Sequence, residues 1–437
     1  MSESVTTGKK RRDNTQVVAP VIFSRADHPI SRTLIDDDAL KVLYRLRKFN
    51  HAAYLVGGGV RDLLLQRHPK DFDIGTSAHP HEVKRIFRNC WIIGRRFRLA
   101  HVKFGQKTIE VATFRKQVPL DENASLPSRD TKETEKQRSD DTNLTRQPIR
   151  RDNTFGTPEE DAFRRDFTIN ALFYDISTFA IIDYVGGMQD LQNKLLRCIG
   201  DPRERFVEDP VRMLRAVAFA ARLDFRVDTP IRDAIKNHHG EIKNASPARL
   251  VEELYKLLRS GVSTKTFKTL SKNGLLEHIA PEVEHKKSMR LWRSLDALDS
   301  YRCRFTSSPE SLTNAVLLGS LMTPVQTLDL TPPRRDDRSV GLTLGDLPLA
   351  RKDVDRLRRA LVLQPRLTDP NLPARAVRGI LTRPSFPDAL TWLTIHGKNP
   401  DAVKHWQELA AKGPRPRPPK KRRRRRLRGP RAVSTNE

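Results

Sequence analysis

The chain has 437 residues, 37% of them hydrophobic, so it is long enough for two or three domains with buried cores. Its 81 Lys and Arg against 53 Asp and Glu give a formal net charge of +28, which makes nucleic acid the leading partner. The three scattered cysteines exclude a disulfide framework and a cysteine-based zinc site, and the lack of any run of 18 apolar residues predicts no transmembrane segment.

The N-terminal part of the sequence changes from polar to globular. Residues 1–35 lack an apolar period and carry four consecutive basic residues at 9–12, which predicts a disordered basic arm. A helix is expected next, because apolar residues recur at helical spacing: Ala39, Val42, Leu43 and Leu46. Residues 53–56 then predict a buried strand that ends at three glycines, and residues 60–66 a helix that leaves this glycine turn.

A mixed α/β layer is expected to follow. Residues 72–74 resemble a short second strand, residues 81–87 a helix, and residues 101–104 with 108–114 a hairpin. Residues 117–150 contain too few large apolar side chains to pack, which predicts a mobile loop.

The second half of the chain is predicted to be mostly helical. Residues 167–174 and 181–184 look like strands, and helical patterns dominate from Met188 onward. One helix is expected after Ser246 as its N-cap, with an apolar face formed by Leu250, Leu254, Leu257 and Leu258. Residues 412–431 contain twelve Lys or Arg and no acid, which predicts a disordered basic tail.

Two carboxylates in the string Asp71-Phe72-Asp73 point to metal-dependent chemistry. On a strand, residues i and i+2 share one face, while Phe72 would point to the opposite face and anchor the strand in the core. Paired carboxylates can hold Mg²⁺ for phosphoryl or nucleotidyl transfer. An isolated string of this kind is more often a solvated turn. The preceding glycine turn at 57–59 favours the chemical interpretation, because its backbone amides can approach a triphosphate closely.

A family resemblance becomes visible at these residues. The string Tyr54-Leu-Val-Gly-Gly-Gly-Val-Arg-Asp62, with Lys70-Asp-Phe-Asp73, resembles the head domain shared by bacterial poly(A) polymerases and CCA-adding tRNA nucleotidyltransferases. Further strings resemble the successive motifs of that family, in order, across roughly residues 40 to 260. They are residues 109–115, 164–170, 184–187 and 208–215.

The resemblance implies roles for individual residues. Asp71 and Asp73 would be catalytic ligands of Mg²⁺, and Asp166 would complete the active site or engage the ribose of the nucleotide. The nucleotide would be bound by Gly57, Gly58, Arg61 and Arg165, with Arg165 near the phosphates. Glu110, expected on an adjacent strand, is a candidate third carboxylate with weaker support, and the alternative is a salt bridge within the hairpin.

A second group of candidate residues lies at a predicted helix start. Residues 208–210 mark this start, with Asp209 as the N-cap, and Asp209, Arg212 and Arg215 then share one helix face. In the family this face looks at the incoming base, where a carboxylate and a guanidinium could read the Watson–Crick edge of either A or C. The alternative is a helix cap with an ion pair inside the helix.

The resemblance also implies an activity. Residues 92–102 resemble the segment that distinguishes poly(A) polymerases from their CCA-adding relatives, and the basic tail favours sequence-blind phosphate contacts with RNA. We therefore expect template-independent addition of AMP from ATP to the 3′ ends of RNA rather than DNA, in the cytoplasm, in support of mRNA polyadenylation and decay. Two alternatives remain: a CCA-adding enzyme and a non-catalytic basic RNA-binding protein. The oligomeric state stays open.

The expected fold class is α+β. The resemblance implies a nucleotidyltransferase head with a mixed β-sheet and helices, followed by mostly helical RNA-binding domains. The expected boundaries place the basic arm at 1–35, the head at 36–187 with its loop at 117–150, a helical nucleotide- and RNA-binding neck at 188–260, a helical body at 261–410 and the basic tail at 411–437.

Overall fold

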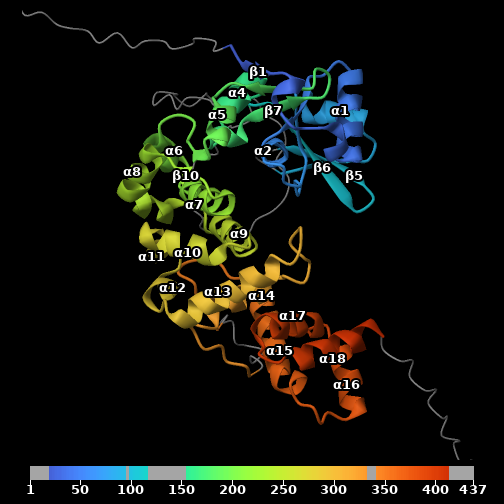
Figure 1. Cartoon of the computed structure of the whole chain (residues 1–437), viewed down its shortest axis with the longest axis vertical. Coiled ribbons are helices and arrows are strands. Elements are labelled where there is room, and N and C mark those ends of the chain that lie inside the picture. Colours follow the sequence, from blue (N-terminus) through green and yellow to red (C-terminus); the bar gives the residue numbers. More distant parts are fainter. Residues whose placement is uncertain (1–18, 95–97, 117–153, 332–340, 413–437) are drawn as a thin grey trace, which may run out of the picture.

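The computed structural model describes residues 19–94, 98–116, 154–331 and 341–412. The chain follows an arc, from an α/β head through successive helical layers to a helical bundle at the other end (Figure 1). This arrangement confirms the predicted α+β class. The predicted loop at 117–150 and almost all of the predicted tail lie outside the described residues. Within the described part of the chain, no helix is both long and apolar enough to cross a membrane.

The head is built on one sheet with the strand order β1-β8-β7-β2-β3-β6-β5-β4. All neighbouring strands are antiparallel except β3 and β6, which are parallel, so the sheet is mixed. The strands are β1 Val21–Phe23, β2 Ala53–Val56, β3 Asp73–Thr76, β4 Cys90–Ile93, β5 Leu99–Phe104, β6 Lys107–Thr113, β7 Leu172–Asp175 and β8 Ala180–Asp183.

Two helices, α1 (Asp37–Lys48) and α3 (Pro80–Ile86), pack against the sheet. Helix α1 begins where the Asp36 carboxylate accepts hydrogen bonds from the next free backbone amides, at 3.0 and 3.3 Å, which is the usual role of an N-cap aspartate. Its predicted apolar stripe is confirmed as buried: Ala39, Val42, Leu43 and Leu46. On the facing strands Ile74 and Val111 belong to the same core, so their neighbours in sequence point to the opposite face of the sheet.

Three expectations for the head need correction. The arm predicted for residues 1–35 is wrong from residue 19 onward, because β1 pairs antiparallel with β8 and Ile30 is fully buried. A three-residue edge strand pairs through its backbone, and it is too short for an alternating pattern of apolar and polar side chains to be recognised in the sequence. The strand predicted at 167–174 is interrupted by a 3₁₀ turn at Thr168–Asn170, and the strand predicted at 72–74 is shifted, since β3 begins only at Asp73.

Helices dominate after the head, as predicted. Two short helices, α2 Gly58–Leu64 and α4 Pro158–Phe163, still belong to the head, and α5 Gly187–Gln192 and α6 Pro202–Glu208 follow its last strand. A small parallel sheet pairs β9 Leu195–Leu196 with β10 Arg226–Val227. The helices that follow are α7 Val211–Leu223, α8 Thr229–His238, α9 Pro247–Leu258, α10 Ser263–Lys272, α11 Leu275–Ile279, α12 Pro281–His285, α13 Met289–Arg302 and α14 Asn314–Met322. The apolar face predicted for α9 is buried.

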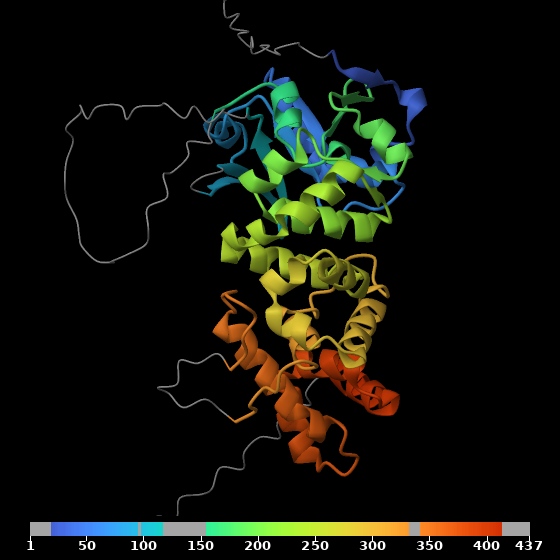
Figure 2. The ribbon, with the colours of Figure 1, turned by 90° about the vertical axis from the view of Figure 1, so that its left-hand side faces the viewer.

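The end of the arc contains a second hydrophobic core. It lies among α15 Arg351–Leu367, α16 Ala374–Leu381, α17 Phe386–His396 and α18 Pro400–Ala411, which form the lowest group of helices in Figure 2. The buried residues of this core form a cluster separate from the main one: Ala360, Leu363, Leu367, Ile380, Phe386, Ala389, Leu393 and Trp406. The other domain boundaries expected from the sequence stay predictions.

Candidate active site

The glycine turn after β2 brings the backbone close to an arginine. Gly57 has φ +71°, a left-handed conformation that favours glycine, and a Cβ on it would lie 3.1 Å from an Nη atom of Arg165. Arg165 is held in place because it donates to the carbonyl of Asn170 at 3.0 Å and to Asp161 at 2.9 Å. The turn and this guanidinium therefore form a cationic wall at the end of β2.

The paired carboxylates occupy different environments. Asp73 is the first residue of β3 and is half-buried, whereas Asp71 precedes the strand and keeps 68% of its side chain exposed, 3.4 Å from the ammonium of Lys70. Burial, together with the negative charges of Glu110 and Asp71, raises the pKa of Asp73 to about 6. The predicted placement of both aspartates on one strand is therefore wrong, although their charges still act on each other.

A divalent cation fits these two carboxylates. Oxygen ligands suit Mg²⁺, and a cation would relieve the repulsion that raises the pKa of Asp73. Among the described residues, no three His, Cys, Asp or Glu side chains are placed to hold a metal together. Mg²⁺ is commonly held by one or two carboxylates plus substrate phosphates, so two aspartates beside a phosphate site are a sufficient protein contribution.

Glu110 lies on β6, next to β3, and faces the same side of the sheet as Asp73. Its carboxylate is 3.7 Å from Nε2 of His101, the residue opposite it on β5, and 51% of its side chain is exposed. The hairpin contact weighed as the alternative for this residue is therefore present, and it is a salt bridge only when His101 is protonated. Glu110 also contributes to the raised pKa of Asp73.

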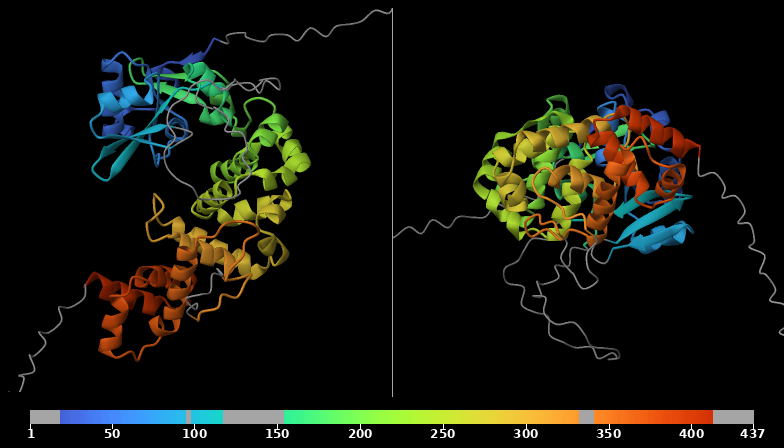
Figure 3. Two further views of the ribbon diagram at one scale, coloured as in Figure 1. Left: turned by 180° about the vertical axis from the view of Figure 1, so that it is seen from behind. Right: turned by 90° about the horizontal axis from the view of Figure 1, so that it is seen from below.

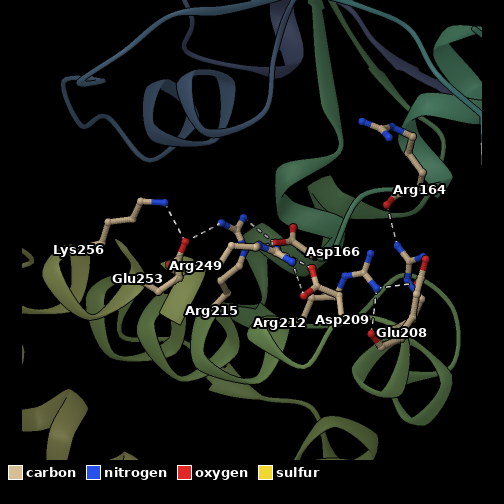
Figure 4. A network of polar contacts seen from close by, with 10 residues as sticks. Arg164, Asp166, Glu208, Asp209, Arg212, Arg215, Arg249, Glu253 and Lys256 are labelled. Atoms are coloured by element: carbon tan, nitrogen blue, oxygen red, sulfur yellow. Dashed lines mark hydrogen bonds and ion pairs between the residues drawn. The ribbon is translucent and has the colours of Figure 1, made fainter. Parts of the chain in front are cut away.

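Asp166 joins the head to the helices behind it. Its carboxylate accepts from Arg215 of α7 at 2.7 Å, from the amide of Phe167 at 2.8 Å and from the side chain of Asn170 at 3.1 Å. Burial alone would raise the pKa of Asp166, but Arg215 and these hydrogen bonds outweigh it and lower the pKa. Asp166 is thus held as a buried anion that fixes the position of Arg215 (Figure 4).

The helix start predicted at 208–210 is a corner between two helices. Helix α6 ends at Glu208 and α7 begins at Val211, so Asp209 is not the N-cap of α7. Both oxygens of Asp209 instead accept from Arg249 of α9, at 2.9 and 2.8 Å. Arg212 pairs with Glu208 at 2.7 Å rather than with Asp209 (Figure 4). The three residues expected on one helix face therefore have three different partners.

Helix α9 supplies residues that the sequence interpretation missed. Arg249 and Glu253 lie four residues apart on it, Arg249 exposed and Glu253 buried, and Glu253 is 3.8 Å from Arg215 (Figure 4). The i, i+4 spacing of two opposite charges was the available signal, but such pairs usually lie on solvated helix faces.

These groups enclose a cavity of about 480 Å³ between the head and α7 and α9. Its walls are strongly polar, with six arginines and four carboxylates. All the candidate residues expected from the sequence line it except Asp71 and Glu110. The lining residues are Gly57, Gly58, Arg61, Asp73, Arg165, Asp166, Asn170, Asp209, Arg212, Arg215, Phe219, Arg222, Arg249 and Glu253. The arrangement can bind a polyanion against the arginines and still present carboxylates to a cation and to a base.

Two family models match the chain. One, described as the poly A polymerase head domain, covers residues 53–197, and the other, described as a probable RNA and SrmB binding site of polymerase A, covers residues 224–287. Together they include every residue of the cavity except those between residues 198 and 223, which link the two.

Known proteins of two kinds are similar to this chain. Poly(A) polymerase I of Salmonella typhi is 49% identical over 262 residues, which are 60% of this chain and 54% of that protein. The CCA-adding enzyme of Lactobacillus helveticus is 37% identical over 254 residues, 57% of each protein. The chain thus matches little more than half the length of these curated relatives.

A solved structure shares the fold. The CCA-adding enzyme of Bacillus stearothermophilus, determined in complex with CTP, superposes with a TM-score of 0.56 at 23% identity, over 88% of this chain and 82% of that one. The likeness extends beyond the region matched in sequence and concerns the arrangement of the elements.

Proposed function

We infer the function from one premise: residues 53–287 belong to the bacterial poly(A) polymerase family. We propose that the chain adds AMP from ATP to the 3′ hydroxyl of RNA without a template and releases pyrophosphate, in the service of mRNA polyadenylation and decay. The observation that carries this proposal is the cavity in which Asp73 and Arg165 of the head face Asp209 and Arg215 of the helices behind it.

Each part of the cavity has a proposed role in the transfer. Asp73 in the cavity wall and the nearby Asp71 would hold Mg²⁺, which when bound would supply activation of the attacking hydroxyl and neutralisation of the leaving pyrophosphate. Arg165 and the amides of the glycine turn bind the triphosphate, because both offer donors at the end of β2. Arg61 supports them: it is buried and donates to Asn170, whose carbonyl also holds Arg165.

The groups at the α6–α7 corner are proposed to read the base. Asp209 and Arg212 offer an acceptor and a donor, the pair of functions that an adenine or cytosine edge requires. Arg215 positions this corner through its buried pair with Asp166. Arg249 orients Asp209 through two hydrogen bonds, which limits the directions from which a base can approach the carboxylate.

We expect Asp209→Ala to raise the KM for ATP about tenfold and to narrow the preference for ATP over CTP, since one charged hydrogen bond contributes roughly 1.5–3 kcal/mol. Steady-state kinetics with each nucleotide measures both effects. Asp233→Ala removes an exposed carboxylate from α8 and serves as the matched control. An unchanged nucleotide profile in Asp209→Ala would reduce this residue to a structural partner of Arg249.

A CCA-adding activity is the second candidate, because a CCA-adding relative is 37% identical to the chain over 254 residues. The two activities differ in their product. A CCA-adding enzyme must change from CTP to ATP and stop, whereas a poly(A) polymerase that grips RNA by its phosphates meets the same substrate after every addition.

We therefore predict that ATP alone, with Mg²⁺ and an unstructured RNA, gives a ladder that extends well past three nucleotides, while CTP alone gives little product. Denaturing gel electrophoresis after incubation with each nucleotide separately measures this. Addition of only C, C and A to tRNA-like acceptors would replace the proposal by the CCA-adding activity. Binding of RNA without incorporation of any nucleotide would favour the non-catalytic alternative.

A further inference from the structure

Four residues form a row across one face of the head sheet. In the register of the antiparallel strands, Trp91 of β4 lies opposite His101 of β5, and His101 lies opposite Glu110 of β6. Ile74 of β3 pairs with Val111, so the preceding residue, Asp73, lies beside Glu110. Neighbouring strands are about 4.8 Å apart, which puts Trp91 roughly 14 Å from the candidate metal ligand along the row.

This face of β4, β5 and β6 is open at the Trp91 end. The alternate residues Cys90, Ala100 and Val102 are buried against the helices on the other face. Trp91, in contrast, is 51% exposed, and Lys103 holds its ammonium 5.0 Å from the centre of the indole ring. The β5–β6 hairpin projects from the edge of the head that faces the body, both in Figure 1 and in the left view of Figure 3.

The chemistry of this end of the row suits single-stranded nucleic acid. An exposed indole offers a stacking platform to any base, and the ammonium of Lys103, which lies over the ring in the absence of RNA, can move to the phosphate of the stacked nucleotide on its flexible side chain. The net charge of +28 attracts such a polyanion. The row is also continuous with the cavity, since Asp73 belongs to both.

We propose that single-stranded RNA lies along this row, with its 3′ end at Asp73 and an upstream base stacked on Trp91. A stacked strand rises roughly 3.4 Å per nucleotide, so the 14 Å span places the stacked base about four nucleotides from the 3′ end, or fewer if the strand is extended. Lys103 pairs with the adjoining phosphate. The inference rests on the proposed function and adds an RNA subsite to it.

Binding of oligo(A) to the full chain without nucleotide tests the subsite directly. The chain has four tryptophans, and the fluorescence quenching that RNA causes is expected to shrink clearly in Trp91→Phe. Trp91→Ala is expected to raise the Kd for a decamer about tenfold, because base stacking on an aromatic ring is a substantial part of such binding. Trp91→Phe keeps a ring and is expected to change the Kd about twofold.

Phe49→Ala is the matched control. Phe49 is an exposed aromatic residue in the same head, 50% accessible, with the guanidinium of Arg45 5.9 Å from its ring. It follows α1, on the other face of the sheet, so its replacement is expected to leave the Kd unchanged. Equal Kd values for Trp91→Ala and the wild type, or equal quenching in Trp91→Phe, would overturn the proposal.

Kinetics separate the subsite from the activity. Trp91→Ala is expected to raise the KM for RNA about tenfold and to leave the KM for ATP unchanged, and the effect is expected to vanish with a dinucleotide primer too short to reach Trp91. If Trp91→Ala alters sedimentation instead of RNA affinity, the face belongs to a second copy of the chain and the proposal fails. If RNA quenches the fluorescence of Trp91 but the chain adds no nucleotide to any RNA, the proposed function is overturned while the RNA subsite is supported.

Discussion

Asp73→Asn in the full chain is expected to reduce the rate of nucleotide addition by about a thousandfold, while the Kd for RNA changes less than twofold. A catalytic metal contributes several kcal/mol to the transition state, and each 1.4 kcal/mol corresponds to a factor of ten. The amide has nearly the shape of the carboxyl group, so the fold is retained. Single-turnover incorporation of ATP, with RNA binding measured separately, checks both parts. Near-normal activity at ordinary Mg²⁺ concentrations would contradict the metal assignment.

The same variant should be more stable than the wild type in the presence of a chelator. The pKa of Asp73 is about 6 in the folded chain against 3.8 for an ordinary aspartate, so the unfolded chain loses this proton first as the pH rises. The ionisation of Asp73 therefore lowers the folding stability progressively as the pH rises from 3.8 to about 6, and above pH 6 the stability stays at this lower value. We expect a higher melting temperature for Asp73→Asn at pH 8 and no difference at pH 3.5.

Asp233→Asn, on the exposed side of α8, is the control for this comparison, and its melting temperature should match the wild type at both pH values. A lower melting temperature for Asp73→Asn at pH 8 would contradict this expectation, because it would show that the ionised Asp73 stabilises the fold through its neighbours more than burial and repulsion destabilise it. Added Mg²⁺ should reduce the difference between the wild type and Asp73→Asn, because the cation compensates the buried charge.

Removal of residues 412–437 is expected to weaken RNA binding more than a hundredfold at low salt without abolishing nucleotide addition. The segment 412–431 carries twelve Lys or Arg. If about six of them contact single-stranded phosphates, the slope of log affinity against log salt shrinks by roughly four units. Titrations with a labelled RNA at several salt concentrations measure this slope.

A full-length substitution variant isolates the role of charge. Replacing the basic residues of this segment by glutamine keeps its length, and the salt slope should match that of the truncated chain. Equal slopes for the full-length and truncated chains would assign the segment to another partner.

Local patterns predicted the parts of the fold that depend on local interactions. The apolar stripe of α1 and the strand β2 followed from spacing alone, because each buries a face determined by its own residues. β1 could not be found in this way, since its place depends on the free edge of β8, about 160 residues later in the chain.

The candidate site shows the same division. The glycine turn and the aspartates of residues 71–73 were visible as strings, but the partners of Asp209 and Asp166 were not. Asp209 pairs with Arg249, forty residues away, and Asp166 with Arg215, forty-nine residues away. Asp209 does not cap α7 as expected, because Pro210 occupies the N-cap position and the carboxylate of Asp209 binds Arg249 of α9 instead. Pairings of this kind depend on tertiary structure, which no spacing rule encodes.

The separate core of the last four helices bears on how such a chain can diversify. Its residues pack mainly among themselves, and the family models end at residue 287, well before α15 begins. Helices α15 and α17 also place Leu357 and Trp392 in the main core, so only substitutions among the residues of the second core need not disturb the packing that holds Asp73, Arg165 and Arg215 in place. Sequence variation confined to this second core can therefore be tolerated without a matching change in the candidate active site at the far end of the arc.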